Sequence, residues 1–431
     1  MQLFIPPKFH PFAMLVARMV LPWRLLLADK VTRVEVDEES LERLKTLTGQ
    51  RVVLCPNHSY EADSVVMFYL SSRLRHFWYF LSALENLLVP VQGLLLRNMG
   101  AYSIIRGTID RPSFHCSRHL LAEGKRWLVI FPEGEIVGQN DVVGEFQPGV
   151  AQFSFWALDN LRAANPESEL PPIYAVPMAI KYLLSRDVRP VIAQRMARLE
   201  RKLGLTDYPA DIYDRLAQIG QAVLMMAEHE YGIQPAPDIL FSDRVLAAKG
   251  AILTRVAREV GVVLRPEQSQ LDQVRALFNA VDRVMWAEPA KTVYARHLQR
   301  EHQRRVVALY TDLWRVLRFA ATFDGYVRET MTWERLIELI NRLEWELYGI
   351  QRIIGPLTAV VRIGPHLNVT TYYDAYLRNK RGTLTSVTAE LEGAVREMLT
   401  ELNTRTTPLE RLPQPANTRN YHRSGWAPRV R

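Results

Sequence analysis

The sequence predicts an α/β fold, with a central sheet flanked by helices and a large all-helical region set apart from it. Three observations lead to this prediction. Strand-like and helical runs alternate between about residues 50 and 184, whereas residues 185–350 are almost entirely helical in pattern. Strand character then returns at residues 357–369. Such alternation is typical of a sheet covered by helices, and the all-helical region is either an insertion or a second domain.

The alternating part of the chain has short apolar runs separated by turn residues. We expect strands at 51–55, 77–82, 101–105, 127–131 and 173–182, and helices after Asp63, near 85–96, around 113–123 and at 149–161. Runs of this length between turn signals suit buried strands. These segments therefore form the core of the predicted sheet.

The all-helical region has apolar residues at helical spacing. Residues 242–261 carry a one-sided apolar stripe that ends at Gly261. Residues 331–349 show the same pattern, with Thr332 as a predicted N-cap and Gly349 as a predicted stop. Such stripes favour a helix-bundle core rather than a cofactor site.

The two ends of the chain have different patterns. An amphipathic helix is expected at 386–402, and the tail at 404–431 is rich in Pro, Arg and Asn, which predicts disorder. At the other end, the apolar run 12–28 is interrupted by charges and a proline and falls short of the roughly 20 residues of a membrane span. Its mixture of Phe, Met, Leu and Trp with Arg suits a helix in the membrane interface, so residues 1–30 are assigned to an interface segment. The alternative is a helix that packs on the domain.

Composition limits the partners. The chain carries 54 Lys and Arg against 46 Asp and Glu, a net charge of +8, which favours an anionic partner such as a membrane surface, a phosphorylated substrate or nucleic acid. No zinc-finger spacing, RNA-binding signature or Walker loop supports nucleic acid. His115 and His119 lack a suitably spaced third ligand, so no metal site is expected. Two cysteines cannot build a disulfide framework and indicate a reducing compartment.

The stretch CPNHSYEADS carries the chemistry. His58 follows a predicted strand, and Asp63 lies in the first turn of the predicted helix. A histidine on such a loop can take a proton from a hydroxyl group. An acid one turn into the helix can bond the other ring nitrogen and fix its tautomer. This pair would activate an alcohol supplied by a substrate.

Four stretches together resemble a known family. NHSYEAD, GAYSIIR, FPEGE and AVPMAI are similar, in order and spacing, to the four sequence blocks of the glycerolipid acyltransferases, the group that includes 1-acylglycerol-3-phosphate acyltransferase. The resemblance covers about residues 30–184. It implies a mixed central sheet, with the catalytic core at 31–184.

The resemblance also implies an activity and roles for individual residues. Such enzymes move a fatty acyl group from acyl-CoA or acyl-carrier protein to a glycerol hydroxyl, with no cofactor beyond that co-substrate. His58 would be the general base, and Asp63 would orient it. The substrate-binding residues would be Asn57 (holding the loop or the thioester carbonyl), Arg106 (the acceptor phosphate), Glu133 and Gly134 (the acceptor pocket), and Pro177 of the fourth block. A lysophospholipid or related glycerolipid acceptor is expected, on the cytoplasmic face of a membrane.

One block departs from the family pattern. The family block often continues F-P-E-G-T-R-S, whereas this chain has Glu135 and Ile136 in place of the threonine and arginine. An added acid beside a phosphate site is unfavourable for a dianion. Either another basic residue compensates, with Lys181 and Arg97 as candidates, or the acceptor differs from lysophosphatidate.

The returning strand bears on domain organisation. AVVRIGPHLNV and the helix after it resemble family elements that normally follow the fourth block much sooner. We therefore predict that residues 185–355 are a helical insertion and that 356–403 return to the acyltransferase core. The alternative is an independent helical domain. Two other functions also remain open: a lipid-binding or scaffolding protein acting through its helical region, and an esterase or thioesterase that uses His58 to activate water.

Overall fold

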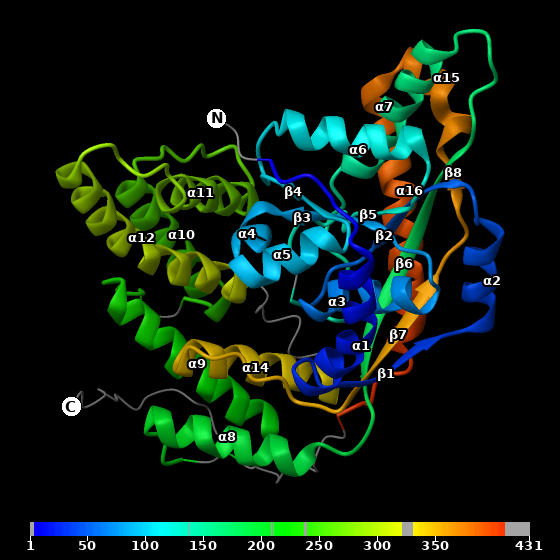
Figure 1. Cartoon of the computed structure of the whole chain (residues 1–431). Helices are drawn as coiled ribbons and strands as arrows, with labels where there is room; N and C mark the ends of the chain where they lie inside the picture. The colour runs from blue at the N-terminus through cyan, green and yellow to red at the C-terminus, as the bar shows by residue number, and fades with distance from the viewer. Residues whose placement is uncertain are drawn as a thin grey trace.

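The computed structural model describes residues 4–136, 138–207, 209, 211–236, 239–320 and 331–409. A mixed eight-stranded sheet lies at the centre, and helices cover both of its faces (Figure 1). A block of further helices stands to one side of this core in the same view. The predicted α/β class, with a mixed sheet and a large all-helical part, is confirmed.

The sheet has a parallel part and an antiparallel part. Its strands are β1 (Val31–Val36), β2 (Arg51–Pro56), β3 (Tyr79–Ala83), β4 (Ala101–Ile104), β5 (Leu128–Val129), β6 (Ile173–Leu184), β7 (Leu357–Ile363) and β8 (Leu367–Asn368). Their order is β1-β7-β6-β2-β5-β3-β4, and β8 pairs with β6. β6, β2, β5, β3 and β4 are parallel neighbours, whereas β7 runs antiparallel to β6. The parallel part carries all four sequence blocks at or near its strands.

Helices cover the sheet on both sides. The helices of this part are α1 (Pro11–Leu27), α2 (Glu38–Thr46), α3 (Ala62–Arg73), α4 (Leu84–Leu88), α5 (Pro90–Asn98), α6 (Arg111–Glu123), α7 (Gly149–Ala164), α15 (Tyr373–Arg378) and α16 (Lys380–Asn403), with a short 3-10 turn at Val369–Tyr372. One apolar cluster joins α6, α7 and α16 to the sheet, and a second joins α1, α2 and α3 to it. The sheet is therefore buried on both faces, as its nearly continuous apolar strands require.

The helical region has cores of its own. It contains α8 (Arg189–Leu203), α9 (Ile212–Glu230), α10 (Phe241–Val260), α11 (Gln270–Met285), α12 (Val293–Ala320) and α14 (Trp333–Tyr348). α10, α11 and α12 share one apolar cluster, and α8, α9 and α14 share another. The Thr332 side chain accepts a hydrogen bond from the Arg335 amide, and Gly349 ends α14 in the left-handed conformation, as both residue types predict.

The strand after the helical region returns to the central sheet. β7 pairs with β6 on one side and with β1 on the other, so it lies inside the sheet. An insertion requires this arrangement, because the helices α8 to α14 then interrupt the sequence of one sheet. The division of the chain into domains stays a prediction, which this pairing favours over an independent helical domain.

The structure corrects three details of the sequence analysis. β1 was missed, although its last four residues, Arg-Val-Glu-Val, alternate polar and apolar side chains as a strand does. The helix expected near 85–96 is two short helices, because Pro90 starts a new one. The tail expected to be disordered is packed in its first residues: Leu409 is buried, and its amide donates to the carbonyl of Met331. Residues 410–431 lie outside the described residues.

Candidate active site

The residues singled out by sequence collect at one edge of the sheet. His58 follows β2, Glu133 and Gly134 follow β5, and Arg106 follows β4. These strands are parallel, so their carboxyl ends meet at the same edge, where ligands of α/β sheets commonly bind. The backbone order alone therefore brings three of the four blocks together.

His58 and Asp63 form a direct pair. Nδ1 of His58 lies 3.1 Å from Oδ2 of Asp63, which also accepts a hydrogen bond of 2.8 Å from the Tyr60 amide. The Asp63 side chain is fully buried, whereas the His58 side chain is 16% exposed. The histidine ring stacks on Phe131, with ring centroids 4.1 Å apart. The acid therefore fixes Nδ1 and leaves Nε2 as the ring nitrogen for a reacting group.

Glu133 holds the histidine loop from the other side. Its carboxylate accepts a 2.6 Å hydrogen bond from the His58 amide and a 2.9 Å bond from the Gly144 amide. Burial raises the pKa of Glu133 to about 7, although the His58 and Gly144 amides oppose that rise. Because its two oxygens bond the His58 and Gly144 amides, the carboxyl group of Glu133 positions the loop that carries His58. The chain turns directly after Glu133, at Gly134, which has a φ of 72°.

Arg106 is held between two acids. Its guanidinium pairs with the carboxylates of Glu85 and Glu135, and the Arg106 side chain is 23% exposed. Burial would lower the pKa of this arginine, but the two carboxylates outweigh burial and raise it. Glu135 was expected to disfavour a phosphate here. In the structure, it occupies one of the directions in which Arg106 would bind an anion.

A cavity of about 1260 Å³ opens at this edge of the sheet. His58, Arg106, Gly134 and Glu135 are among its lining residues; Glu133 contacts His58, and Arg106 contacts Gly134 and Glu135, so we call this group the polar end of the cavity. Apolar side chains line much of the rest, among them Phe80, Leu96, Met99, Phe153 and Trp156. A site with one polar end and a long apolar wall suits a substrate with a polar head and an aliphatic chain.

Comparison with known protein families identifies this part of the chain. Residues 33–181 match the family model described as Acyltransferase. Residues 33–181 belong to the acyltransferase family. The family predicted from the four sequence blocks is thereby confirmed, and acyl transfer is the general activity that the family supports. A search of curated proteins finds no match to the chain.

Three of the predicted substrate-binding residues are not among the described residues that line the cavity: Glu133, whose carboxylate bonds the His58 and Gly144 amides, Asn57 and Pro177. Asn57 is fully buried, and its side chain bonds both the amide and the carbonyl of Ile180 in β6. Asn57 thus ties the loop to the sheet, which is the first of the two roles expected for it. Pro177 is an internal position of β6, in register with Cys55 of β2.

The two basic residues expected to compensate for Glu135 do not reach it. Lys181 is fully buried elsewhere, where its ammonium pairs with Asp141 and donates a 2.7 Å hydrogen bond to Asn403. The expectation for Lys181 is therefore wrong, because this buried ion pair already uses its charge. Arg97 lies in α5 and is not among the described residues that line the cavity. Within the described part of the chain, no group of three or more His, Cys, Asp or Glu side chains could hold a metal ion.

Sequence reasoning missed the residues that support Asp63. The Tyr182 hydroxyl donates a 2.7 Å hydrogen bond to Oδ1 of Asp63, across 119 positions of sequence. The Tyr60 hydroxyl donates a 2.6 Å bond to Glu338 of α14, which is 278 positions away. No local pattern marks such contacts, because each joins segments that only the fold brings together.

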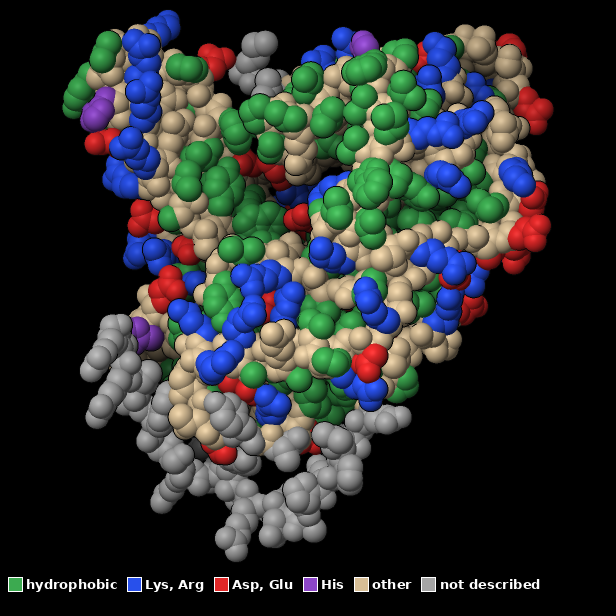
Figure 2. Space-filling model, turned by 60° about the horizontal axis from the view of Figure 1, so that its bottom comes forward, with side chains coloured by type: hydrophobic (Ala, Val, Ile, Leu, Met, Phe, Trp, Pro, Cys, Tyr) green, Lys and Arg blue, Asp and Glu red, His purple; other side chains and the backbone are tan. Residues whose placement is uncertain are grey.

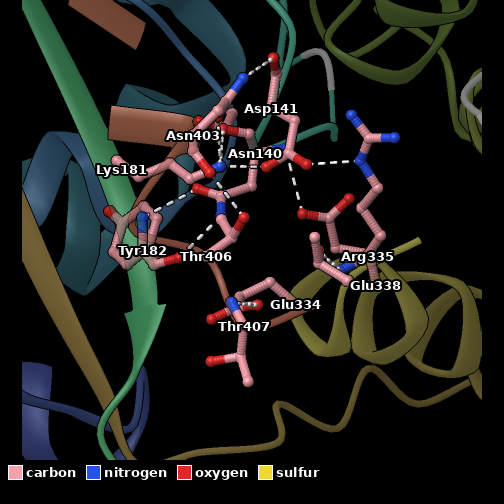
Figure 3. A network of polar contacts seen from close by, with 12 residues as sticks. Asn140, Asp141, Lys181, Tyr182, Glu334, Arg335, Glu338, Asn403, Thr406 and Thr407 are labelled. Atoms are coloured by element: carbon pink, nitrogen blue, oxygen red, sulfur yellow. Dashed lines mark hydrogen bonds and ion pairs between the residues drawn. The ribbon is translucent and has the colours of Figure 1, made fainter. Parts of the chain in front are cut away.

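A polar network connects α14 to β6 and to the loop that contains Asn140 and Asp141 (Figure 3). Glu338 also accepts a 3.0 Å bond from the Asn140 amide, and the Asn140 side chain bonds both backbone groups of Tyr182. Beside them, Asp141 pairs with both Lys181 and Arg335. The helical region therefore contacts the same tyrosine that bonds Asp63.

Proposed function

We propose that this protein transfers a fatty acyl group from acyl-CoA or acyl-carrier protein to the hydroxyl group of a lysophospholipid or related glycerol phosphate. The pairing of His58 with the buried Asp63 at the polar end of an apolar cavity carries this proposal. The family match over residues 33–181 supports the reaction class, and the apolar lining of the cavity supports a lipid substrate.

The reaction follows from the orientation of His58. Asp63 accepts the Nδ1 proton, so Nε2 of the neutral imidazole takes the proton of the acceptor hydroxyl as its oxygen attacks the thioester carbon. The tetrahedral intermediate then collapses, the carbon–sulfur bond breaks, and the leaving thiolate takes the proton from the imidazolium. Asp63 stabilises the imidazolium throughout, as the acid of a catalytic triad does.

Acyl transfer by the full-length protein in mixed micelles tests the proposal. Labelled acyl-CoA and acyl-carrier protein would be offered with a panel of lysophospholipids and monoacylglycerol. His58→Ala should lower transfer by roughly 10²- to 10⁴-fold, the usual contribution of a general base. His115→Ala, at an exposed histidine on α6, should retain wild-type transfer. Transfer that survives in His58→Ala would overturn the mechanism, and hydrolysis that outruns transfer would identify a thioesterase.

We also propose that the protein works at a membrane surface as a peripheral protein. α1 buries Met14, Ala17 and Leu25 against the core, yet its other side exposes Phe12, Leu15, Met19, Val20, Trp23 and Leu27. Val91, Leu94 and Leu95 of the neighbouring α5 are exposed as well. Figure 2 shows hydrophobic side chains gathered on a face of the molecule beside a hollow. Exposed apolar side chains next to cationic ones suit an anionic lipid interface.

This surface adjoins the mouth of the active-site cavity. Val20 and Arg24 of α1 and Val91 and Leu95 of α5 also line that cavity. A lipid acceptor could therefore pass from the bilayer to His58 along apolar side chains. None of the helices in the described ranges combines the length and the apolar character needed to cross a bilayer.

Vesicle flotation tests the membrane contact. The double variant Trp23→Ser/Leu94→Ser should bind vesicles containing phosphatidylglycerol about tenfold less than the wild type does, because two exposed apolar side chains are lost. Val263→Ser changes a side chain that is 89% exposed elsewhere and should bind normally. Equal binding by both variants would contradict this docking surface.

A further inference from the structure

A buried arginine of the helical region lines the active-site cavity. Arg275 belongs to α11, is 6% exposed, and shares the cavity wall with His58 and Arg106. Its Nη2 donates a 3.1 Å hydrogen bond to the carbonyl of Glu133, in the same loop that holds His58. The helical region thus places a positive charge at the polar end of the cavity.

The surface of the catalytic core has room for this arginine. At Gly134, an added Cβ atom would lie 3.0 Å from Nη2 of Arg275. At Gly107, an added Cβ would lie 3.2 Å from Cβ of Arg275. Both glycines have positive φ values, so a side chain at either position would also strain the backbone. Two glycines that follow different strands thus accommodate one arginine from α11.

The two arginines that line the cavity near His58 differ in how closely they are paired with carboxylates. Arg106 makes close ion pairs with two carboxylates. Among the described residues, the acidic partners of Arg275 are distant, at 3.5 Å from Nε to Glu135 and 3.4 Å from Nη1 to Asp272. Charge-assisted bonds of this kind are usually 2.7–2.9 Å long, so these two contacts are weak. A buried guanidinium with weak partners can accept a further anion.

We propose that Arg275 binds a phosphate group of the substrate, with Glu135 linking it to Arg106. This inference rests on the proposed function. It gives Arg275 the role of the basic residue that the family block F-P-E-G-T-R-S has and the FPEGEI stretch lacks. The carboxylate of Glu135 contacts both guanidinium groups, so it is itself an anion held between two arginines. The phosphate belongs either to the acceptor head group or to CoA, and the two sources are separated by experiment.

Acceptor specificity gives the first test. The wild type, Arg275→Gln and the control Arg283→Gln, an exposed arginine on the same helix, would be assayed with 1-acylglycerol 3-phosphate and with monoacylglycerol. Arg275→Gln should lower the kcat/KM ratio of the phosphorylated over the neutral acceptor by about tenfold or more. Arg283→Gln should keep the wild-type ratio. A KM for acyl-CoA that rises by that factor, with an unchanged acceptor ratio, would assign the site to CoA phosphate. Unchanged values for both substrates would overturn the proposal.

A binding measurement separates this inference from the proposed reaction. Glycerol 3-phosphate and CoA would be titrated into full-length His58→Ala, which does not need to catalyse transfer. Adding Arg275→Gln should weaken binding of one of them about tenfold or more, whereas Arg275→Lys, which keeps the charge, should recover part of it. Equal affinities in all three proteins would overturn the role of Arg275, whatever the transfer assay shows. Circular dichroism of each variant would establish that it is folded.

Discussion

Two of the contacts between the helical region and the sheet core are built differently. At α14, acids and bases are close together and buried: Asp141 pairs with Lys181 and Arg335. At α11, Arg275 lies 3.5 Å from its carboxylate partner Glu135 and faces a cavity. Closely paired charges hold two segments together, whereas a loosely paired charge beside a cavity can still bind a ligand. The helical region thus anchors the loop between His58 and Asp63 at one contact, and in our proposal it contributes to the substrate site at the other.

The largest expected effect breaks the α14 contact. Asp141→Ala leaves the buried Lys181 and the largely buried Arg335 without this carboxylate, so the free energy of unfolding should fall by roughly 3–5 kcal/mol. Chemical denaturation of the full-length protein measures this. Asp187→Ala removes an exposed ion pair with Arg189 and should leave the free energy of unfolding nearly unchanged, because solvent screens that pair. Equal losses in the two variants would mean that the network does not hold the regions together.

The next-largest effect concerns Glu133, which contacts both the loop of His58 and the helix α11. Its carboxylate bonds the His58 amide, and its carbonyl accepts from Arg275. Its pKa is about 7 in the folded protein against an ordinary 4.5, so the folded state binds the proton more tightly. The resulting stability is fully present below pH 4.5 and is lost as the pH rises through 7, by roughly 3 kcal/mol in total.

Glu133→Gln should remove this pH dependence. The difference in unfolding free energy between wild type and variant, measured from pH 4.5 to 8, should change by that amount in favour of the variant as the pH rises. Asp29, whose pKa is raised to about 6 mainly by burial, titrates in the same range but is present in both proteins. A difference that stays constant with pH would show that Glu133 ionises normally.

A smaller effect tests the hydrogen bond that supports Asp63. Tyr182→Phe removes one hydrogen bond to the buried carboxylate of Asp63 and should lower kcat about tenfold, with little change in acceptor KM. Tyr373→Phe removes an equivalent 2.8 Å bond to Asp159, outside the cavity, and should leave kcat unchanged. The pH profile of kcat should also shift in Tyr182→Phe alone. Identical kinetics in the two variants would remove Tyr182 from the positioning of His58.

The smallest effect is expected when the hydrogen bond between α14 and the loop of His58 is broken. Tyr60→Phe breaks the hydrogen bond to Glu338, so the loop between His58 and Asp63 loses one anchor to the helical region. The value of kcat should fall about fivefold, which corresponds to one ordinary hydrogen bond. The discrimination between phosphorylated and neutral acceptors should not change, because Arg275 is untouched. A loss of that discrimination would contradict the separation between the two contacts.

Much of the fold and the centre of the site were predictable because their causes are local. A strand followed by a turn and a helix places His58 and Asp63 on adjacent structure, so a spacing of five residues already implies their contact. The caps at Thr332 and Gly349 depend on one residue type each. Lys181 shows the limit of such reasoning: it was expected to compensate for Glu135, yet its side chain binds Asp141 and Asn403.

The sequence by itself determined the mixed α/β class, the acyltransferase family and the His58–Asp63 pair. Strand pattern, helix spacing and short motifs are properties of neighbouring residues, and they fix local geometry wherever the chain goes. The tertiary structure alone decided that β7 enters the catalytic sheet, that Tyr182 supports Asp63, and that Arg275 stands beside Glu133, 142 positions away. Those contacts depend on how distant helices and strands pack. The residues next to a side chain in the sequence do not specify that packing.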